Sequence, residues 1–482
     1  MDIRSVLVKF IYHRDSSGSS GIMINNGYVI TTFATIAPFL NQSDSQIISL
    51  KKSNQPIETY LKEKFGNLPF FIHYKDEEDG PVSAKRAFLD KCFFSEELCQ
   101  STKKIFHYWS ADSPDKKEIV NLMYLFIILK IELSNTDFQK DVSRWFENLP
   151  KAAFRKGQHL RCMSAALGNE NFLDHCSVGI VSNIIGKNDS LIFSDMPLTP
   201  GSEGSPVHCD SLCSYPVGIV ISSTNWWNNE CINFSVIADL SQVLQEFLKP
   251  GESISIVNKR RVNNENTKLI DAVESSLFQM YNGLVWGTAI LIEKEKGILI
   301  TNAHVVDGIF DNVIHTIEGP IICDVIYSTD SNISLDIAIL KTRKPLGPVY
   351  KSINFSKNKL GRGDLVYAAG FPIFKRDTNM GPTITEGCIS HIHPHVIKTT
   401  CSVYPGASGG AILDQTGGLV AIIVSNVGIM KPKTTYFPKF NMNIPISILQ
   451  PILENYITTE DVEYLKKISQ INVSVWNCFS KL

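Results

Sequence analysis

Short apolar stretches separated by turn-forming residues run along most of the chain. The stretches are rich in Val, Ile and Thr, are alternating or wholly apolar, and are separated by Gly, Pro, Asn and Asp. This pattern predicts many short β-strands. Because the edges of antiparallel strands must be paired or covered, we expect the strands to close into barrels, which makes the fold class mainly β.

Helical periodicity is confined to the end of each half of the chain. Apolar residues recur at helical spacing over 235–248, over 445–457 and in a last segment that begins at Thr458. The longest apolar run, residues 122–129, is too short to span a bilayer and is expected to form a buried strand. The sequence therefore predicts short helices at the end of each half and no membrane insertion.

The first half of the chain repeats the second half at low resolution. Three pairs of segments share their pattern: 19–39 with 285–310, 126–132 with 337–343, and 176–207 with 386–412. In both halves the last segment closes with a Gly-rich turn that leads into an apolar strand. We interpret the repetition as a duplication of one domain.

This duplication sets the expected domain boundaries. A chain of 482 residues is too long for a single core and favours two domains. We expect a first domain over 1–250 with an insertion at about 45–118, a polar linker over 251–268, a second domain over 269–457, and a C-terminal helix and tail over 458–482. The insertion is charged and contains Cys92 and Cys99, and it is either a surface excursion or a docking or regulatory segment.

Composition and charge exclude several classes of protein. With a formal net charge of -2, nucleic acid and anionic membranes are not expected partners. The N-terminal sequence lacks the apolar core of a secretory signal, so we expect an intracellular protein. Eleven cysteines without a repeating spacing fit free thiols better than a disulfide framework.

Two groups of metal-ligating residue types are present, and neither predicts a metal site. Cys209 and Cys213 beside His208 could supply half a zinc site, but no second pair accompanies them. The run HIHPH at 391–395 is interrupted by a proline and is expected to form a hairpin turn. We expect no metal and no cofactor.

Three residue types in the second half predict nucleophilic catalysis. His304 follows an apolar strand in LITNAHVV, Asp336 precedes another in SLDIAILK, and Ser408 lies between small residues in YPGASGGAI. A serine hydroxyl needs an imidazole to accept its proton and a carboxylate to hold that imidazole. Each residue alone has a plainer structural explanation, but the three in this order match the chymotrypsin-type arrangement.

The glycines around Ser408 predict an oxyanion hole. Gly406 and Gly409 allow a tight turn, in which the backbone amides of Gly406 and Ser408 can converge on the oxyanion of a tetrahedral intermediate. An oxyanion hole of this kind is needed by any enzyme that transfers an acyl group through such an intermediate.

The motifs T-N-A-H-V-V, D-I-A-I-L and G-A-S-G-G resemble the signature blocks of trypsin-like proteases in the form used by the HtrA/Deg group. In its whole layout the chain resembles the peroxisomal leader peptide-processing proteases, which are related to plant glyoxysomal Deg-type enzymes. The resemblance implies tandem trypsin-like double β-barrel domains. It also implies a serine endopeptidase that removes N-terminal leader peptides from imported peroxisomal proteins, commonly after a cysteine, and cuts some C-terminally targeted cargo.

The first half lacks all three catalytic residue types. Aligning the two halves places Glu203 opposite Ser408, Ala34 opposite His304, and Leu125 opposite Asp336. Three independent losses predict a trypsin-like domain that is catalytically degenerate.

By analogy with trypsin-like folds, the specificity pocket is expected at Ser402, Val424, Ser425 and Asn426. None of these residues carries a fixed charge, which predicts a neutral, small-to-medium side chain at the cleavage position. Two other functions remain open: a serine esterase or thioesterase that uses the same triad, and a non-catalytic protease-like scaffold.

The last three residues, Ser480, Lys481 and Leu482, form the S-K-L tripeptide that directs proteins to peroxisomes. We therefore expect localisation in the peroxisomal matrix, with the peroxisomal import receptor as one partner and matrix proteins as substrates. A second copy of the chain is a further candidate partner.

Overall fold

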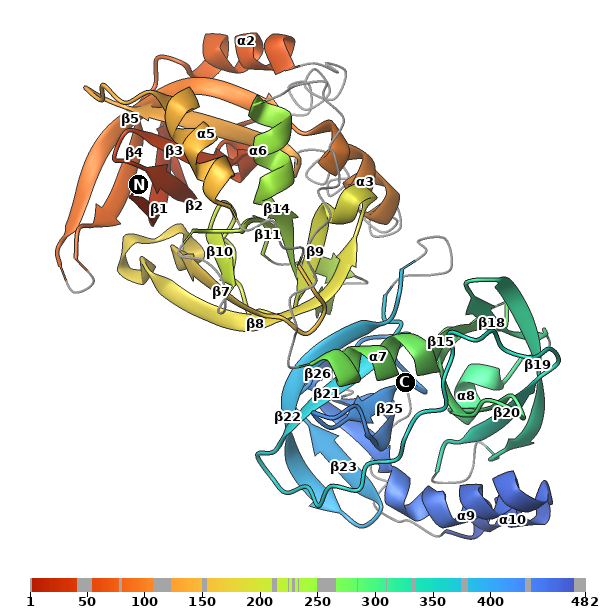
Figure 1. Cartoon of the computed structure of the whole chain (residues 1–482). Helices are drawn as coiled ribbons and strands as arrows, with labels where there is room; N and C mark the ends of the chain where they lie inside the picture. The colour runs from red at the N-terminus through yellow and green to blue at the C-terminus, as the bar shows by residue number, and fades with distance from the viewer. Residues whose placement is uncertain are drawn as a thin grey trace. The chain divides into compact units, whose positions relative to one another are not determined.

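The chain divides into two compact units, residues 1–262 and 263–482. Our computed structural model describes residues 2–40, 54–77, 80–106, 123–149, 154–209, 215–223, 225–227, 230–232, 234–248, 266–283, 285–308, 310–330, 335–373, 380–429 and 435–471. Each unit contains two closed barrels of six strands (Figure 1). The predicted fold class, mainly β with tandem double-barrel domains, is confirmed.

The barrels of the first unit have the strand orders β1-β2-β3-β6-β5-β4 and β10-β11-β14-β9-β8-β7. The first barrel consists of β1 (Ile3–Tyr12), β2 (Asp15–Ile24), β3 (Tyr28–Thr32), β4 (Phe70–Lys75), β5 (Val82–Phe94) and β6 (Leu125–Ile131). The second consists of β7 (His159–Ser164), β8 (His175–Ile185), β9 (Leu191–Ser194), β10 (Pro206–Cys209), β11 (Gly218–Ser222) and β14 (Ser235–Asp239). A separate hairpin is formed by β12 (Asn225–Trp227) and β13 (Glu230–Ile232). The buried strand expected at 122–129 is confirmed by β6.

Four α-helices are described in the first unit: α2 (Asn54–Phe65), α3 (Glu96–Phe106), α5 (Phe138–Asn148) and α6 (Leu240–Leu248). Short 3-10 turns are η1 (Phe33–Thr35), η2 (Ala37–Phe39), η3 (Ala166–Gly168), η4 (Glu170–Phe172) and η5 (Lys187–Asp189). The helix expected over 235–248 is wrong at its start. Residues 235–239 are fully buried and pair with both β9 and β11, so they form a barrel strand instead.

The predicted insertion over 45–118 is wrong in its middle part. β4 pairs with β1, and β5 pairs with both β4 and β6, so residues 70–94 close the first barrel. Additional chain therefore lies before β4, where α2 forms, and after β5, where α3 forms. Ser101 of α3 is hydrogen bonded to Ser190 at 3.0 Å, which joins α3 to the second barrel of the same unit.

The second unit repeats this plan with the strand orders β15-β16-β17-β20-β19-β18 and β21-β22-β23-β26-β25-β24. Its first barrel consists of β15 (Leu277–Tyr281), β16 (Trp286–Glu293), β17 (Ile298–Thr301), β18 (Asn312–Thr316), β19 (Gly319–Ser328) and β20 (Ala338–Thr342). The second consists of β21 (Leu365–Gly370), β22 (Thr383–His393), β23 (Val396–Thr399), β24 (Ala411–Leu413), β25 (Leu419–Ile429) and β26 (Thr435–Pro445). Each barrel is filled by its inward apolar side chains, with Phe278, Leu291 and Leu340 in the first and Val366, Ile412 and Ile423 in the second.

The helices of the second unit are α7 (Thr267–Ser276), α8 (Ala303–Val306), α9 (Ile446–Thr459) and α10 (Glu463–Gln470). The expected C-terminal helices are present as α9 and α10, whereas α7 begins within the segment expected to be a linker. Lys296 Nζ donates to the carbonyl of Ile457 at 2.6 Å and forms an ion pair with Glu460, so the end of α9 is fixed to the first barrel. None of the described helices has the length and apolar character needed to cross a membrane.

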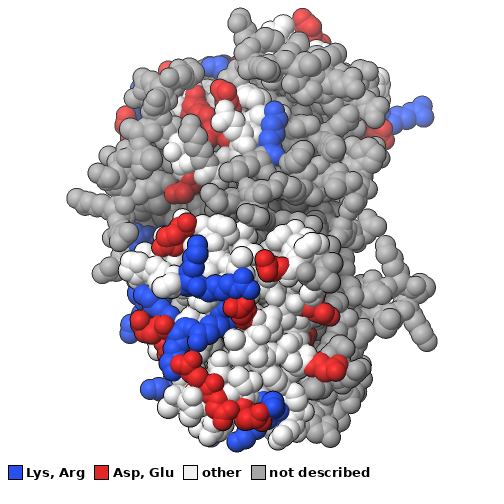
Figure 2. Space-filling view, turned by 90° about the vertical axis from the view of Figure 1, so that its right-hand side faces the viewer, with Lys and Arg blue, Asp and Glu red and all other residues white. Residues whose placement is uncertain are grey.

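The described surface in Figure 2 carries Lys and Arg interspersed with Asp and Glu. Ion pairs of the second unit reflect this mixture, such as Arg343 with Asp324 at 2.7 Å and Lys351 with Asp271 at 2.8 Å. These pairs are solvent-exposed, so each one contributes little to stability.

Candidate active site

His304 and Asp336 form a direct contact. The Nδ1 atom of His304 lies 2.6 Å from Oδ2 of Asp336, and the backbone N–H of His304 donates to Oδ1 of the same carboxylate at 3.1 Å. Asp336 is only 2% exposed, whereas the His304 side chain is 29% exposed. The carboxylate is thus buried behind an imidazole whose far edge reaches solvent, which is the arrangement a general base requires.

Local sequence explains why these two residues meet. α8 is a single helical turn whose Ala303, Val305 and Val306 are buried, so His304 takes the remaining face. Asn302 precedes the helix, and its side-chain amide donates to the carbonyl of Asp336 at 2.8 Å. This hydrogen bond ties the chain before His304 to the chain before β20.

Ser408 lies in a tight turn between two glycines with positive φ, Gly406 at +95° and Gly409 at +79°. A Cβ at Gly406 would lie 2.3 Å from Nε1 of Trp286 and 2.5 Å from the carbonyl oxygen of Phe371, so only glycine fits. The backbone amides of Gly406 and Ser408 have no acceptor among the residues that the structure describes. Two unsatisfied N–H groups beside the serine are what the predicted oxyanion hole requires.

The hydroxyl of Ser408 donates to the carbonyl of Val424 at 3.1 Å. Within the described ranges there is no hydrogen bond between Ser408 and His304. A hydroxyl has a single proton, so the Ser408 side chain must rotate away from Val424 before an imidazole can accept that proton.

Residues 287–422 match the family model described as "Trypsin-like peptidase domain". This range lies within the second unit, which we call the peptidase domain below because of this match. All three residues predicted for the triad lie within the matched range.

Full-length relatives extend the likeness beyond this domain. The chain is 25% identical over 371 residues to the "Peroxisomal leader peptide-processing protease" of Homo sapiens, covering 72% of this chain and 63% of that protein. It is 26% identical over 346 residues to the protein of the same name from Mus musculus, covering 66% and 59%. The chain thus spans less than two thirds of the length of these relatives. The family resemblance expected from the motifs is confirmed.

Among solved structures, the "serine endoprotease from Yersinia pestis" matches with a TM-score of 0.33 and 22% identity, over 42% of this chain and 70% of that one.

The four residues predicted for the specificity pocket of the peptidase domain, Ser402, Val424, Ser425 and Asn426, are each less than a tenth exposed. The Nδ2 atom of Asn426 donates to the carbonyl of Val403 at 2.8 Å. Two more buried asparagines, Asn441 and Asn443, bind the carbonyls of Cys401 and Ile397 in the same way. These three asparagines hold the segment before the nucleophile turn, and no local motif in the sequence predicts their contacts.

Strand register confirms the alignment of the two halves. Thr31 pairs with Ile127 in the first unit, as Thr301 pairs with Ala338 in the peptidase domain. Counting along the same strands places Ala34 at the position of His304 and Leu125 at that of Asp336. The first unit therefore lacks both members of the contact described above.

The glycine turn of the first unit is preserved around Glu203. Gly201 has φ of +91° and Gly204 of +88°, close to the values at Gly406 and Gly409. The carboxylate of Glu203 accepts the amide of Gly201 at 2.9 Å through Oε2 and the amide of Ser223 at 3.1 Å through Oε1. Gly201 corresponds to Gly406, so a side-chain carboxylate of the chain itself occupies the anion site of the first unit.

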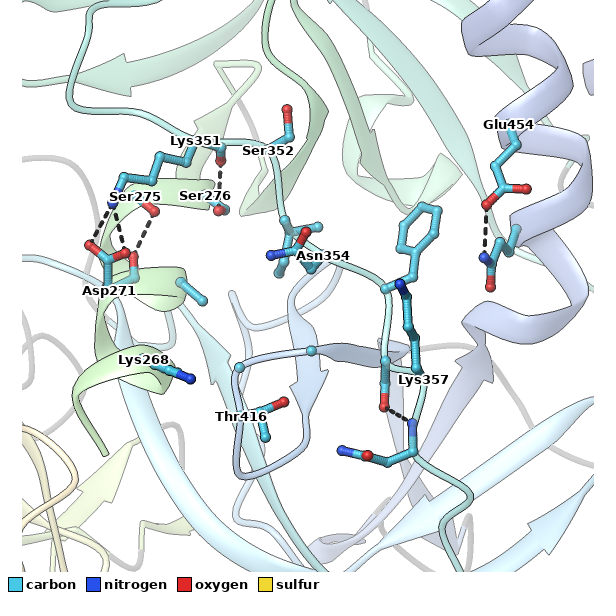
Figure 3. Close-up of a pocket in the computed structure, with 18 residues that line it drawn as sticks. Lys268, Asp271, Ser275, Ser276, Lys351, Ser352, Asn354, Lys357, Thr416 and Glu454 are labelled. Atoms are coloured by element: carbon cyan, nitrogen blue, oxygen red, sulfur yellow. Dashed lines mark hydrogen bonds and ion pairs between the residues drawn. The ribbon is translucent and has the colours of Figure 1, made fainter. Parts of the chain in front are cut away.

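A cavity of about 680 Å³ in the second unit lies between α7, the connection 351–358 and α9 (Figure 3). Its lining is polar and of mixed charge, and it includes none of the three predicted triad residues. Lys351 in its wall is already paired with Asp271. The cavity is separate from the candidate active site.

In the described part of the chain, no group of three or more His, Cys, Asp or Glu side chains is placed to hold a metal ion. Of the run 391–395, residues 391–393 are the end of β22, and residues 394–395 form the expected hairpin turn to β23. As predicted, the cysteines whose side chains are described form no disulfide bonds with one another: Cys92, Cys99, Cys162, Cys176, Cys209, Cys323, Cys388 and Cys401. Cys213 and the tripeptide Ser480, Lys481 and Leu482 lie outside the described residues.

Proposed function

We propose that the chain is a serine endopeptidase of the peroxisomal matrix that removes N-terminal leader peptides from imported proteins and cuts some C-terminally targeted cargo. The observation that carries this proposal is the 2.6 Å contact between His304 and Asp336, in the same domain as a serine turn with two unsatisfied amides. The names of the relatives support the choice of substrate class.

In the proposed mechanism, the hydroxyl of Ser408 turns toward His304 and attacks the scissile carbonyl carbon. The Nε2 atom of His304 accepts the hydroxyl proton, while Asp336 holds the opposite ring nitrogen and stabilises the imidazolium. The amides of Gly406 and Ser408 bind the oxyanion.

When the tetrahedral intermediate collapses, the imidazolium of His304 donates its proton to the leaving amine, and an acyl-enzyme on Ser408 remains. Water then attacks this ester with His304 as the base, which releases the carboxylic acid product and restores the serine. These steps require no metal or cofactor.

The proposal includes two kinds of partner besides substrates. The tripeptide Ser480, Lys481 and Leu482 would be bound by the peroxisomal import receptor. A second copy of the chain is the other candidate, and light scattering coupled to gel filtration would measure the oligomeric state directly.

The decisive experiment is cleavage of a purified peroxisomal precursor that still carries its leader, using wild-type protein and Ser408→Ala side by side. Cleavage by wild type alone, at one site found by N-terminal sequencing of the product, would support the proposal. Labelling of Ser408 by a fluorophosphonate without any peptide cleavage would instead indicate an esterase or thioesterase. Equal cleavage by both proteins would remove Ser408 as the nucleophile.

A further inference from the structure

We propose that Thr288 is the positioning residue of the oxyanion hole. Its hydroxyl and its backbone amide fix alternate peptide groups of the turn 405–409, and the remaining two peptide groups are thereby left with free N–H groups. This inference rests on the proposed function, because it assigns a role in the reaction of Ser408.

Thr288 lies in β16 and is fully buried. Its Oγ1 accepts the N–H of Phe371 at 3.0 Å and lies 3.0 Å from the carbonyl of Gly406. A hydroxyl has one proton, so with Phe371 as donor the Thr288 proton goes to Gly406. The backbone N–H of Thr288 donates to the carbonyl of Ser408 at 2.8 Å.

Both peptide groups that Thr288 contacts are held at their opposite edge as well. The N–H of Ala407 donates to Tyr404 at 3.0 Å, and the N–H of Gly409 donates to Ile423 at 2.9 Å. The peptide groups 406–407 and 408–409 are thus hydrogen bonded on both sides and cannot rotate without breaking two hydrogen bonds each.

The two other peptide groups of the turn are held only through their carbonyls. Pro405 accepts from Ile373 at 2.8 Å, and Ala407 accepts from Gly410 at 2.8 Å. In a planar trans peptide the N–H points away from the C=O, so the amides of Gly406 and Ser408 face away from these partners. The two N–H groups of the oxyanion hole therefore belong to the peptide groups that are held only through their carbonyls, and these alternate with the peptide groups that are held on both sides.

The first unit repeats this arrangement around Ser20. Its N–H donates to Glu203 at 2.9 Å, its Oγ donates to Gly201 at 2.8 Å, and the same Oγ accepts the N–H of Ala165 at 2.9 Å. The same contacts recur where Ala34 replaces the histidine, so they serve the shape of the turn. They also show that the hydroxyl of a serine is sufficient.

Thr288 also connects the turn to the strand before His304. Thr301 donates its hydroxyl to the carbonyl of Thr288 at 2.7 Å, and Thr301 is three residues before the histidine. The residue that fixes the N–H donors of the oxyanion hole is thus hydrogen bonded to the strand that precedes the base.

The test compares Thr288→Val, which keeps the shape of the side chain but not its hydroxyl, with Thr288→Ser, which keeps the hydroxyl. We expect Thr288→Val to lower kcat for a leader peptide by about 10- to 100-fold, with KM within about threefold of wild type, because losing one oxyanion-hole donor outright costs about 100- to 1,000-fold. Thr288→Ser should recover kcat to within about threefold of wild type. Values are expressed per active site titrated with a fluorophosphonate, so misfolded protein does not count.

Ser20→Ala is the matched control, because it removes the same hydrogen bonds from the unit without catalytic residues. It should leave kcat unchanged. A Thr288→Val enzyme with kcat within threefold of wild type, or an equal loss in Ser20→Ala, would overturn the proposal.

If Thr288→Val does not fold, Thr288→Cys supplies the comparison, since a thiol is a weaker donor of similar size. Its kcat should fall by about 3- to 10-fold below that of Thr288→Ser, and equality of the two would overturn the proposal. Ser408→Ala is measured in parallel: cleavage that survives in Ser408→Ala contradicts the proposed function, whereas cleavage that depends on Ser408 but not on the Thr288 hydroxyl contradicts only the positioning role.

Discussion

The carboxylate of Glu203 is hydrogen bonded to the backbone amide of Gly201, the counterpart of the Gly406 amide in the peptidase domain. An anionic side chain therefore takes the place that a reaction intermediate would occupy in an active copy. The contact gives the Gly201 amide of the turn an acceptor in a unit that lacks the histidine and the aspartate of the second unit.

Replacing this carboxylate should destabilise the first unit without affecting catalysis. Glu203→Ala removes the acceptor of the Gly201 amide, and the loss of a partner costs a buried amide about 1–3 kcal/mol. We expect the free energy of unfolding, from urea titration, to fall by about 1–3 kcal/mol and kcat to stay at the wild-type value. A marked loss of kcat with normal stability would show that the first unit takes part in the reaction.

Asp336→Asn should abolish most activity while the fold persists. The amide keeps the shape of the carboxylate, but it no longer holds the imidazole of His304 in the required tautomer. We expect kcat to fall by about 10⁴-fold, with an unchanged circular dichroism spectrum. Activity within tenfold of wild type would mean that another group orients His304.

Gly406→Ala should inactivate the enzyme through its backbone. The residue has φ of +95°, and the added Cβ would collide with Trp286 and the carbonyl of Phe371. We expect kcat to drop by about 100-fold or more, since an oxyanion-hole donor is displaced. Gly201→Ala creates the same strain in the first unit, so it should lower the melting temperature and leave kcat intact. Equal kinetic losses in the two variants would point to general unfolding.

Asp414 should make the stability of the second unit depend on pH. Burial by itself raises the pKa of this carboxyl, but hydrogen bonds from Ser356, Thr416 and Gly418 outweigh burial and hold the pKa below its ordinary value. The stabilisation is therefore complete above about pH 4, the range of an unfolded Asp, and is lost as the pH falls through the lower pKa of the folded state.

Comparison of wild type with Asp414→Asn tests this behaviour. The variant should be less stable by about 2–3 kcal/mol at pH 6, because it loses charge-assisted hydrogen bonds in a buried position. The difference in unfolding free energy should shrink as the pH is lowered from 5 to 3. A difference that stays constant over this range would show that ionisation of Asp414 makes no contribution.

The sequence predicted the barrels, the duplication and the order of the key residues, because these depend on strand periodicity and on local motifs. His304 and Asp336 could be paired in advance since each is next to a recognisable apolar strand. The strands β4 and β5 were mistaken for part of an insertion. β5 carries four charged residues, more than any other described strand, and only the pairing of β4 with β1 and of β5 with β6 shows that the two strands complete a barrel.

Other features depend on contacts between distant residues and have no local signal. Thr288 looks like any threonine in a strand, yet its partners Gly406 and Phe371 are more than 80 residues away in sequence. The same holds for Glu203, whose bond to Ser223 depends on how the turn folds back over β11. The helix α7 was missed because its sequence follows a polar stretch without a clear start signal.

The internal carboxylate also has an evolutionary consequence. Restoring chemistry to the first copy would require a serine at 203, a histidine at 34 and an acid at 125, and the first of these changes alone would empty a satisfied anion site while gaining no base. Each of these substitutions alone therefore brings no catalytic activity, and the substitution at 203 also lowers the stability of the first unit. With Glu203 in the turn, the first copy can accumulate other substitutions, but selection acting on one substitution at a time would not restore catalysis.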